Sequence, residues 1–246
     1  MGKVDFQLWR ERLDAIQEVF DRKSLSGCQY HYDHTVRNIY NYKTGTAKIY
    51  VGPPASLQDV EKTEETLGFR FPSSLRNVFL NFSGSFMVSW LVDEHSVLKK
   101  DQQLDIRSGF CLWNLTEIVH ANSDYESSVA SFDDLAANDE DIRQWISICD
   151  GRRIFMPLDN GDNLLIGIGD DEHQEIVYFS HDEMYPSGGY HDHGKLLGKT
   201  VEEFIDRWMQ LAFVEPEIWN LKQFLNDEGL QVDGEMGKHF KSWFFE

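Results

Sequence analysis

Residues 56–84 read SLQDVEKTEETLGFRFPSSLRNVFLNFSG, and this stretch predicts two helices joined by a sharp corner. The first helix is predicted by four positions with helical spacing, three of them apolar: Leu57, Val60, Glu64 and Leu67. The second is predicted by an apolar set at i, i+3, i+4 and i+7: Leu75, Val78, Phe79 and Phe82. Apolar stripes of this kind face a protein core. The stretch therefore identifies the fold and carries no chemistry of its own.

The corner between the two helices has residues of the types that such a corner needs. Gly68 closes the first helix, because glycine adopts the left-handed conformation at little cost. Pro72 suits the first position of the second helix, where its missing N–H leaves no hydrogen bond unmade. Gly84 ends the second helix. We expect this pair to share one core with a later amphipathic helix through Leu75, Phe79, Phe204 and Trp208.

The composition indicates a globular protein of the cytoplasm. The 246 residues are 41% hydrophobic, which is enough for a sizeable core. Apolar runs stay shorter than the roughly 18 residues that a membrane span needs. Residues 1–16 are charged and amphipathic, unlike a secretory signal. Three widely spaced cysteines predict reduced thiols rather than a disulfide set or a zinc site: Cys28, Cys111 and Cys149.

The charge balance is strongly acidic. Lys and Arg number 23 and Asp and Glu number 42, which gives a formal net charge of −19. Such a chain repels nucleic acid and anionic membranes, so neither is an expected partner. Two interpretations of the charge stay open. It can keep the protein soluble, or it can steer a basic protein partner towards the surface.

Residues 1–55 are predicted to add a helix and a hairpin to the main unit. Residues 5–23 carry apolar side chains at steps of three and four, and Asp5 suits the N-cap. Two β-rich runs, 36–42 and 46–51, flank the sequence Lys-Thr-Gly at 43–45, which predicts a hairpin with its turn there. His31 and His34 have helical spacing but lack a clear third ligand, which favours a surface pair over a metal site.

The rest of the chain is predicted to contain short strands and two further helices. The strands are expected at 86–92, 104–112, 145–149, 153–158, 163–168 and 175–180, with a short helix or crossover at 113–119. Tight turns between the later strands indicate an antiparallel meander. Thr200 and Glu203 form a capping box before an amphipathic helix, and Pro216 is expected to open a last helix that ends at Gly229. The aromatic tail, residues 243–245, is expected to dock on the domain.

Four segments, in this order, resemble a known family. LGFRFPSSLRNVFLNFSG resembles its "LG..LP..Y..FL...NG" helix pair, and IFMPLDNGDNLLIGI resembles its "IPI..DG.G....LD" strand, turn and strand. VYFSHD resembles its "V.YW.HD" strand end, and KTVEEFIDRWM resembles its closing "SFEEFL..L" helix. The family is the SUKH superfamily, which includes the Smi/Knr-type cell-wall assembly regulators of fungi. The chain departs from its pattern at Phe71, Leu75 and Ser83.

The resemblance implies an α+β fold with a curved, mainly antiparallel sheet and helices packed on one side. The SUKH-like domain would span 56–214, between the N-terminal extension, 1–55, and a helical tail, 215–246. The resemblance also implies a non-enzymatic protein-binding role without a cofactor. Bacterial members are commonly cytoplasmic immunity proteins that neutralise toxins, many of them nucleases, whereas fungal members are regulatory hubs of cell-wall assembly. The acidic charge favours a basic toxin as the partner.

Two acidic or histidine-rich segments invite a metal interpretation. The turn at 159–163, DNGDN, lacks the glycine and glutamate positions of an EF-hand, so we interpret it as a hairpin turn. The best zinc candidates lie in the loop His181–His193: His181, His191, His193 and Asp192. A glycine pair leaves that loop unconstrained, and neither a nucleophile elbow nor a phosphate loop is present. We therefore predict no metal, and a metal-dependent hydrolase that uses this loop is the alternative of another class.

The partner-binding residues are predicted on the exposed face of the sheet and its turns. Acidic side chains there would steer a basic partner, and a tryptophan would anchor it. The predicted set is Trp90, Trp113, Asp159, Asp162, Asp170, Asp171 and Glu172. The two tryptophans have a competing interpretation as core residues, because they lie in apolar segments.

Overall fold

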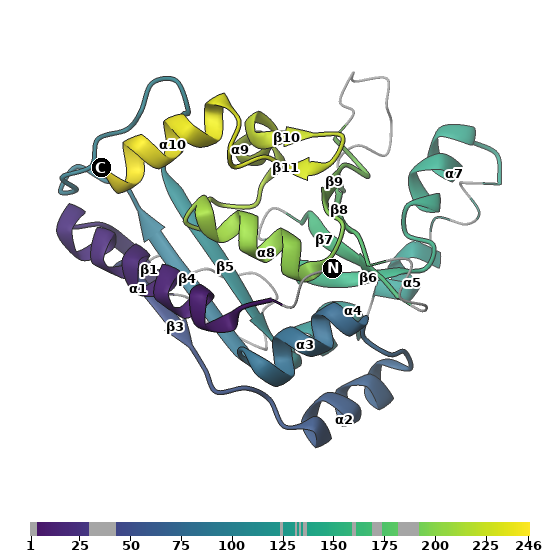
Figure 1. Ribbon diagram of the computed structural model, residues 1–246. Coiled ribbons are helices and arrows are strands. Elements are labelled where there is room, and N and C mark those ends of the chain that lie inside the picture. The colour runs from purple at the N-terminus through teal and green to yellow at the C-terminus, as the bar shows by residue number, and fades with distance from the viewer. Residues whose placement is uncertain are drawn as a thin grey trace.

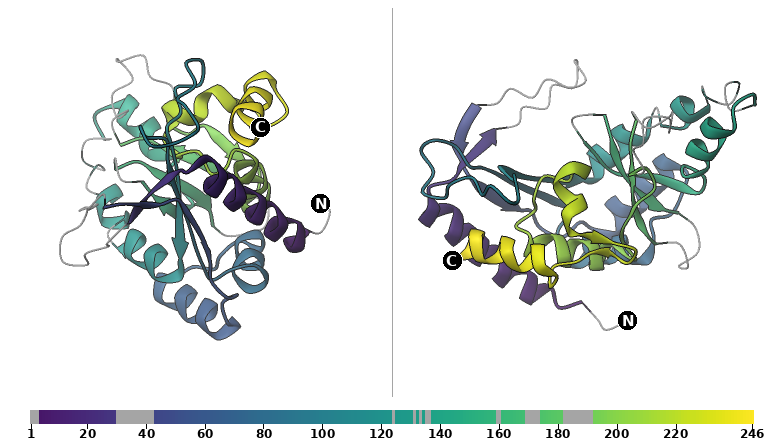
Figure 2. Two further views of the ribbon diagram at one scale, coloured as in Figure 1. Left: turned by 90° about the vertical axis from the view of Figure 1, so that its left-hand side faces the viewer. Right: turned by 90° about the horizontal axis from the view of Figure 1, so that it is seen from above.

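The computed structural model describes residues 4–29, 43–123, 125–130, 132, 134, 137–158, 161–168, 174–181 and 192–246. Figure 1 shows an α+β structure in which helices lie against antiparallel strands. The predicted fold class, a curved antiparallel sheet with helices, is confirmed. Seen from above, α1 (Phe6–Lys23), α8 (Val201–Gln210) and α10 (Glu235–Phe245) lie together on one side of the strands (Figure 2).

The first sheet is built around the strand that follows the helix pair. Its strands are β1 (Ser26–Gln29), β2 (Lys43–Thr46), β3 (Lys48–Val51), β4 (Ser85–Leu91) and β5 (Ser108–Asn114). The order is β2-β1-β4-β3, and β5 pairs with β4 over its whole length. All of these pairings are antiparallel. β5 buries every second residue, as a half-buried strand requires, whereas β4 buries Ser89 in addition to Phe86, Val88 and Trp90.

The second sheet is the meander that the turn residues predict. Its strands are β6 (Arg152–Pro157), β7 (Asn163–Gly167), β8 (Ile176–Phe179) and β9 (Leu196–Gly198), paired antiparallel in chain order. The first three match predicted strands. The sequence does not predict β9, because the strand has only three residues, the last of them is Gly198, and Lys199 follows it.

The helix pair is confirmed. Its helices are α2 (Leu57–Leu67) and α3 (Ser73–Asn81), and Gly68 closes α2 in the left-handed conformation with φ of 74°. Pro72 is the N-cap of α3 rather than its first residue. Glu64 lies at an apolar position of α2 and is 7% exposed. Its carboxylate accepts the Phe71 N–H at 2.8 Å and a hydrogen bond from Arg76. This buried carboxylate therefore fixes the corner, because it bonds both the connecting backbone and α3.

One core joins the segments from both ends of the chain. Leu75, Phe79, Phe204 and Trp208 are at most 1% exposed and belong to one cluster, as expected. Side chains of α1 and Phe244 of α10 belong to the same cluster, so the aromatic tail does dock. The proposed limits of the N-terminal extension and the C-terminal tail stay predictions, although both segments contribute to this core.

Three predicted elements are wrong in detail. Residues 43–46 form β2, which pairs with β1, instead of a turn, and the run at 36–42 lies outside the described residues. Residues 145–147 belong to α7 (Glu140–Ser147), because Ile142, Trp145 and Ile146 form a helical stripe behind the N-cap Asp139. A short apolar run fits a strand and a buried helical turn equally well. The predicted strand at 104–112 begins only at Ser108.

The predicted last helix is also interrupted. The segment after Pro216 forms α9 (Ile218–Leu221), a 3-10 turn (Lys222–Phe224) and a short hairpin of β10 (Leu225–Asn226) and β11 (Gly229–Leu230). Gly229 has φ of 92°, and a Cβ there would lie 2.5 Å from the Leu197 carbonyl oxygen. Glycine at this position thus permits the close approach of the hairpin to β9, rather than ending a helix.

Two side-chain amides bond the outer edges of the two sheets. Gln17 of α1 accepts the Ile49 N–H of β3 at 3.0 Å, and its amide N–H donates to the Ala47 carbonyl at 3.4 Å. Asn122 of α4 (Leu115–Ser123) accepts the Ile154 N–H of β6 at 3.0 Å and donates to the Ile154 carbonyl at 2.8 Å. Each amide therefore hydrogen-bonds backbone groups that would otherwise be free to pair with an additional strand.

A smaller core lies between α7, α5 (Tyr125–Ala130) and the second sheet. His193 joins its parts. Its Nδ1 accepts the Ser180 N–H at 3.1 Å, its Nε2 lies 3.0 Å from the Trp145 carbonyl oxygen, and its ring stacks on Trp145. Burial lowers the pKa of His193 below its ordinary value. Burial likewise raises the pKa of the Cys149 thiol, to about 11, so that this thiol is protonated at neutral pH.

Candidate functional site

The two tryptophans predicted as partner anchors lie in the core. Trp90 and Trp113 are each 1% exposed. The Trp90 indole N–H donates to the Ala212 carbonyl at 2.6 Å, and the Trp113 ring stacks on Phe86 at 4.2 Å between ring centroids. Their prediction as surface anchors is therefore wrong, because β4 and β5 turn these side chains into the core.

The acidic residues predicted for the sheet turns fall into two groups. Asp162 is 4% exposed, and it accepts the His181 N–H at 2.9 Å and a hydrogen bond from the Tyr178 hydroxyl. It is thus a structural group of the second sheet rather than an exposed contact. Four more predicted residues lie outside the described residues, and their role stays a prediction: Asp159, Asp170, Asp171 and Glu172.

The histidine loop is described only at its ends. The His181 Nδ1 lies 2.8 Å from the Asp162 carboxylate, whereas His193 bonds the backbone of Ser180 and Trp145. Among the described residues, no group of three or more His, Cys, Asp and Glu side chains is placed to hold a metal ion. His191 lies outside the described residues, so the expected absence of a metal stays a prediction.

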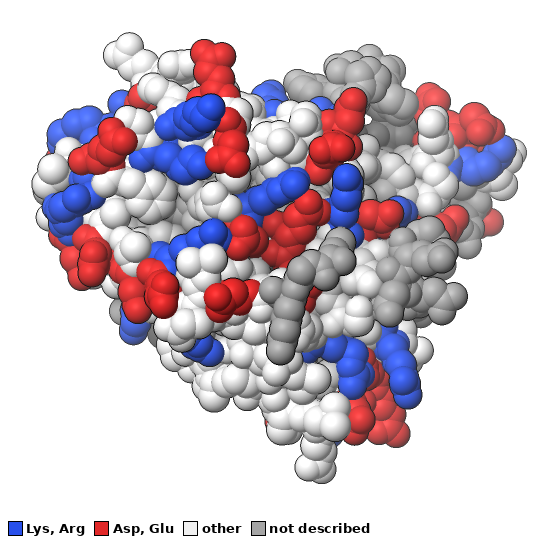
Figure 3. Space-filling model, viewed as in Figure 1, with Lys and Arg blue, Asp and Glu red and all other residues white. Residues whose placement is uncertain are grey.

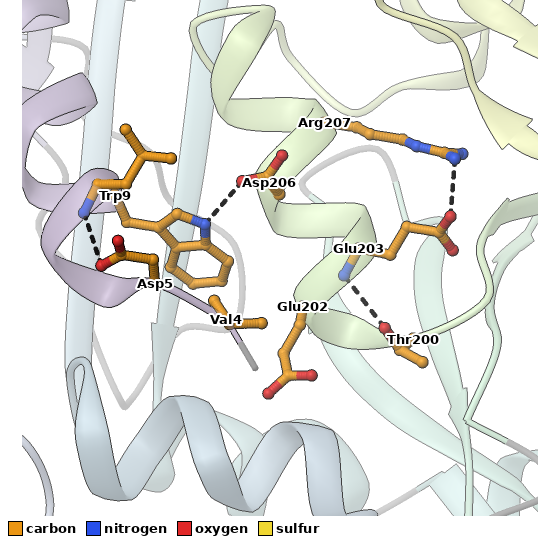
Figure 4. A pocket seen from close by; sticks show the side chains of 9 residues that line it. Val4, Asp5, Trp9, Thr200, Glu202, Glu203, Asp206 and Arg207 are labelled. Carbon is orange, nitrogen blue, oxygen red and sulfur yellow. Dashed lines mark hydrogen bonds and ion pairs between the residues drawn. The ribbon is translucent and has the colours of Figure 1, made fainter. Parts of the chain in front are cut away.

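The structure places a cleft where the N-terminal ends of α1 and α8 meet (Figure 4). Its volume is about 320 Å³. Apolar side chains come from the start of α1 and carboxylates come mainly from α8. The lining residues are Val4, Asp5, Leu8, Trp9, Thr200, Glu202, Glu203, Asp206 and Arg207.

Two capping arrangements set the positions of these side chains. At the start of α1, the Asp5 carboxylate accepts the N–H groups of Gln7 and Leu8 at 3.0 and 3.2 Å. At the start of α8, the Thr200 hydroxyl accepts the Glu203 N–H at 3.1 Å, and the Glu203 carboxylate accepts the Lys199 N–H at 2.8 Å. Carboxylates in a first helical turn also offset the positive end of the helix dipole.

The two helices are tied together at the floor of the cleft. Asp206 of α8 accepts the Trp9 indole N–H at 2.8 Å and pairs with Arg12 at 2.5 Å, both of them from α1. Glu203 pairs with Arg207 at 2.7 Å. These carboxylates remain partly open to water, because the Asp206 side chain is 36% exposed and that of Glu203 is 25% exposed. Exposed pairs of this kind contribute about 0–1 kcal/mol each.

The charge around the cleft is mixed rather than uniformly acidic. On the face shown in Figure 3, Lys and Arg alternate with Asp and Glu, and acidic atoms gather near the centre, over α8. The cleft itself is lined by four carboxylates and one guanidinium. The net charge of −19 therefore does not form one continuous patch on this face.

A second, wider groove of about 630 Å³ lies between residues 53–56, α2 and the start of α4. Its lining is rich in hydroxyl and proline side chains, and its two charged residues, Asp59 and Lys62, balance each other. The groove thus has no net charge, and its lining favours neither a basic nor an acidic partner.

The sequence does not predict the α1–α8 cleft. Asp5 and the capping box at Thr200 are both visible in the sequence, but 195 positions separate them. The pairing of Trp9 and Arg12 with Asp206 identifies the cleft. This pairing is visible only in the folded structure and leaves no signal in the sequence.

Comparison with known proteins identifies the fold family. Residues 54–207 match the SMI1 / KNR4 family (SUKH-1), and the match covers more than half of the chain. The chain belongs to the SUKH-1 family. No curated protein and no solved structure matches the chain. Membership makes the SUKH-1 chain a protein-interaction domain.

The SUKH-1 match includes only one side of the cleft. It begins before α2 and ends within α8, so Glu202 and Asp206 lie inside it, whereas Trp9 lies outside. The cleft therefore combines α8, which begins within the match, with α1, which lies outside it. None of the described helices is long and apolar enough to cross a membrane.

Proposed function

We propose that this SUKH-1 protein is a non-enzymatic, cytoplasmic immunity protein that neutralises a basic toxin of the nuclease kind. The observation that carries the proposal is a net charge of −19 on a protein-interaction domain. A nuclease needs a positive surface to bind its polyanionic substrate. An acidic protein that covers this surface competes directly with the nucleic acid.

Electrostatics would act mainly on the rate of association. Carboxylates on a low-dielectric surface attract a basic partner over a Debye length of roughly 8–10 Å near physiological salt. Charges at the rim of an interface change the association rate, whereas desolvated contacts at its centre set the dissociation rate. Raising the salt concentration should therefore slow binding more than it speeds release.

The placement of polar groups supports a role in binding rather than catalysis. His181 and His193, two of the residues that the alternative hydrolase would use, bond different partners: the Asp162 carboxylate and the backbone around Trp145. The buried carboxylate of Asp162 accepts hydrogen bonds that position β8. These groups therefore have structural partners of their own.

The test uses the purified product of the neighbouring open reading frame, because immunity genes adjoin their toxins. Its nuclease activity would be titrated with the SUKH-1 protein, and association would be followed by stopped flow across a salt series. We expect complete inhibition at equimolar protein and a steep fall of the association rate with salt. Retained nuclease activity at a tenfold excess of the SUKH-1 protein would reject the proposal.

The family resemblance also supports a second role, an intracellular regulator of cell-wall assembly that acts as an interaction hub. The neutral groove beside α2 favours this role, because a hub needs more than one binding surface. Deletion of the gene distinguishes the two roles. A cell-wall defect in the absence of any toxin supports the regulator, whereas sensitivity to the toxin alone supports the immunity protein.

A further inference from the structure

We propose that the α1–α8 cleft accepts an arginine side chain of the protein partner. The inference deepens the proposed function and rests on it, because it names the part of a basic partner that is recognised. It is argued from the shape of the cleft, its apolar wall and its charge (Figure 4).

The shape suits one long side chain. A volume of about 320 Å³ lies at the low end of ligand pockets, which span about 300–1,000 Å³. Leu8 lines this cleft and is 41% exposed, although most large apolar side chains of the described chain are buried. The methylene stem of an arginine covers such a surface while its charged head stays near water.

The charge suits a guanidinium. Four carboxylates line the cleft, and Arg207 is the only cation among the described lining residues. Among the described residues, hydrogen bonds reach Oε1 of Glu202, from Asn77, and Oδ1 of Asp5, from its own helix. An ionised carboxylate offers about four acceptor positions on two oxygens. Glu202 and Asp5 therefore each keep acceptor positions that a guanidinium in the cleft can use.

Other occupants fit less well. An anion would meet four carboxylates, and an apolar peptide would desolvate them without supplying a hydrogen bond. Lysine supplies a compact charge, but it lacks the planar, forked donors with which an arginine pairs with a carboxylate. An arginine on a rigid basic surface satisfies both the apolar wall and the acidic rim.

The test is a titration of the full chain by two-dimensional NMR with a blocked tripeptide, Ala-Arg-Ala. The matched ligand is Ala-citrulline-Ala, which has the same shape without the charge. We expect the Trp9 indole N–H signal and the Leu8 methyl signals to move and saturate with the arginine peptide. The citrulline peptide should bind about tenfold more weakly, the ratio that loss of one charged contact of about 1.4 kcal/mol produces.

Two variants with the same change of charge separate the cleft from the general acidity. Glu202→Gln keeps an oxygen for Asn77 and should weaken the arginine peptide about tenfold, whereas Glu140→Gln on α7 should leave its affinity within about twofold. Equal effects of the two variants, equal binding of the two peptides, or an absence of saturable shifts at Trp9 would each overturn the inference.

The inference and the proposed function fail in different ways. If the toxin is inhibited equally by the wild type and by Glu202→Gln, the cleft is not the arginine site, and the immunity role stands. If the cleft binds the arginine peptide but the toxin keeps its activity, the immunity role is rejected and the site is retained.

Discussion

Glu64 at the corner of the helix pair and Glu202 in the cleft are both helical carboxylates, yet the fold uses them differently. Glu64 is 7% exposed, and its two oxygens bond the Phe71 N–H and the Arg76 guanidinium. Glu202 lies half-buried in the first turn of α8, where one oxygen meets Asn77. The first carboxylate holds two helices together, whereas the second faces a cleft with acceptor capacity to spare.

The difference shows that the net charge of −19 is not one uniform property. Buried carboxylates whose two oxygens both bond groups of the fold contribute to folding and cannot contact a partner. Carboxylates in an open cleft contribute little to folding and remain able to contact a partner. Substitution of a buried carboxylate should therefore lower stability, whereas substitution of a carboxylate in the cleft should lower binding.

The largest loss of stability is expected from the apolar side of the corner. Phe79→Ala should lower the free energy of unfolding by about 3–5 kcal/mol, because it leaves a cavity beside Phe71. Urea denaturation followed by tryptophan fluorescence measures this loss. A loss below about 1 kcal/mol would show that the helix pair is not a part of the core.

The second largest loss of stability is expected from the polar side of the corner. Glu64→Ala should cost about 2–3 kcal/mol, since it leaves the Phe71 N–H and Arg76 without their partner. The cost falls below that of a fully buried pair because the Arg76 side chain is 25% exposed. Glu64→Gln, which keeps an oxygen for the Phe71 N–H, should cost less in the same denaturation experiment. An equal cost for both would contradict the assigned role of the charge.

A buried histidine extends the comparison to pH. His193 has a lowered pKa in the folded state, so the unfolded state binds its proton more readily. Its contribution to stability is therefore present above about pH 6.5 and is lost as the pH falls through the folded pKa. The protection factors for hydrogen exchange in α7, which are corrected for the intrinsic pH dependence of exchange, should fall over this window in the wild type and fall less in His193→Gln. Identical pH profiles would rule out His193 as the acid-sensitive contact.

The smallest change of stability is expected in the cleft. Glu202→Gln should alter the free energy of unfolding by less than about 0.5 kcal/mol, because its side chain is part-exposed and the amide still accepts from Asn77. Thermal denaturation beside the wild type measures it. A loss as large as that of Glu64→Gln would remove the distinction between the two carboxylates.

The sequence predicts those parts of the fold in which a local pattern is compatible with only one type of secondary structure. The helix pair has long apolar stripes, a glycine stop and a proline start, and each of these features excludes strands. For the end of α7 the sequence predicts a strand, because the five apolar-rich residues 145–149 suit either a strand or a helical turn. Its helical stripe begins earlier, at Ile142, in a segment dominated by acidic residues.

The candidate site was less predictable than the fold. Trp90 and Trp113 lie on strands whose inner and outer faces cannot be distinguished until the helices are placed. The cleft depends on contacts between Trp9 and Asp206, which are 197 positions apart. Local patterns carry no information on such distances, whereas the acidic balance of the chain was visible from its composition.

The amides of Gln17 and Asn122 have a consequence for how this protein behaves in a crowded, concentrated solution. Each occupies the backbone groups at the rim of a sheet, where a strand from another molecule would otherwise add on. Asn122 is 8% exposed, so its shield is built into the interior of the domain. Without these amides, one backbone N–H and one carbonyl at the rim of each sheet would lose their partners, and only the packing of α1 and α4 would then keep another strand from those groups.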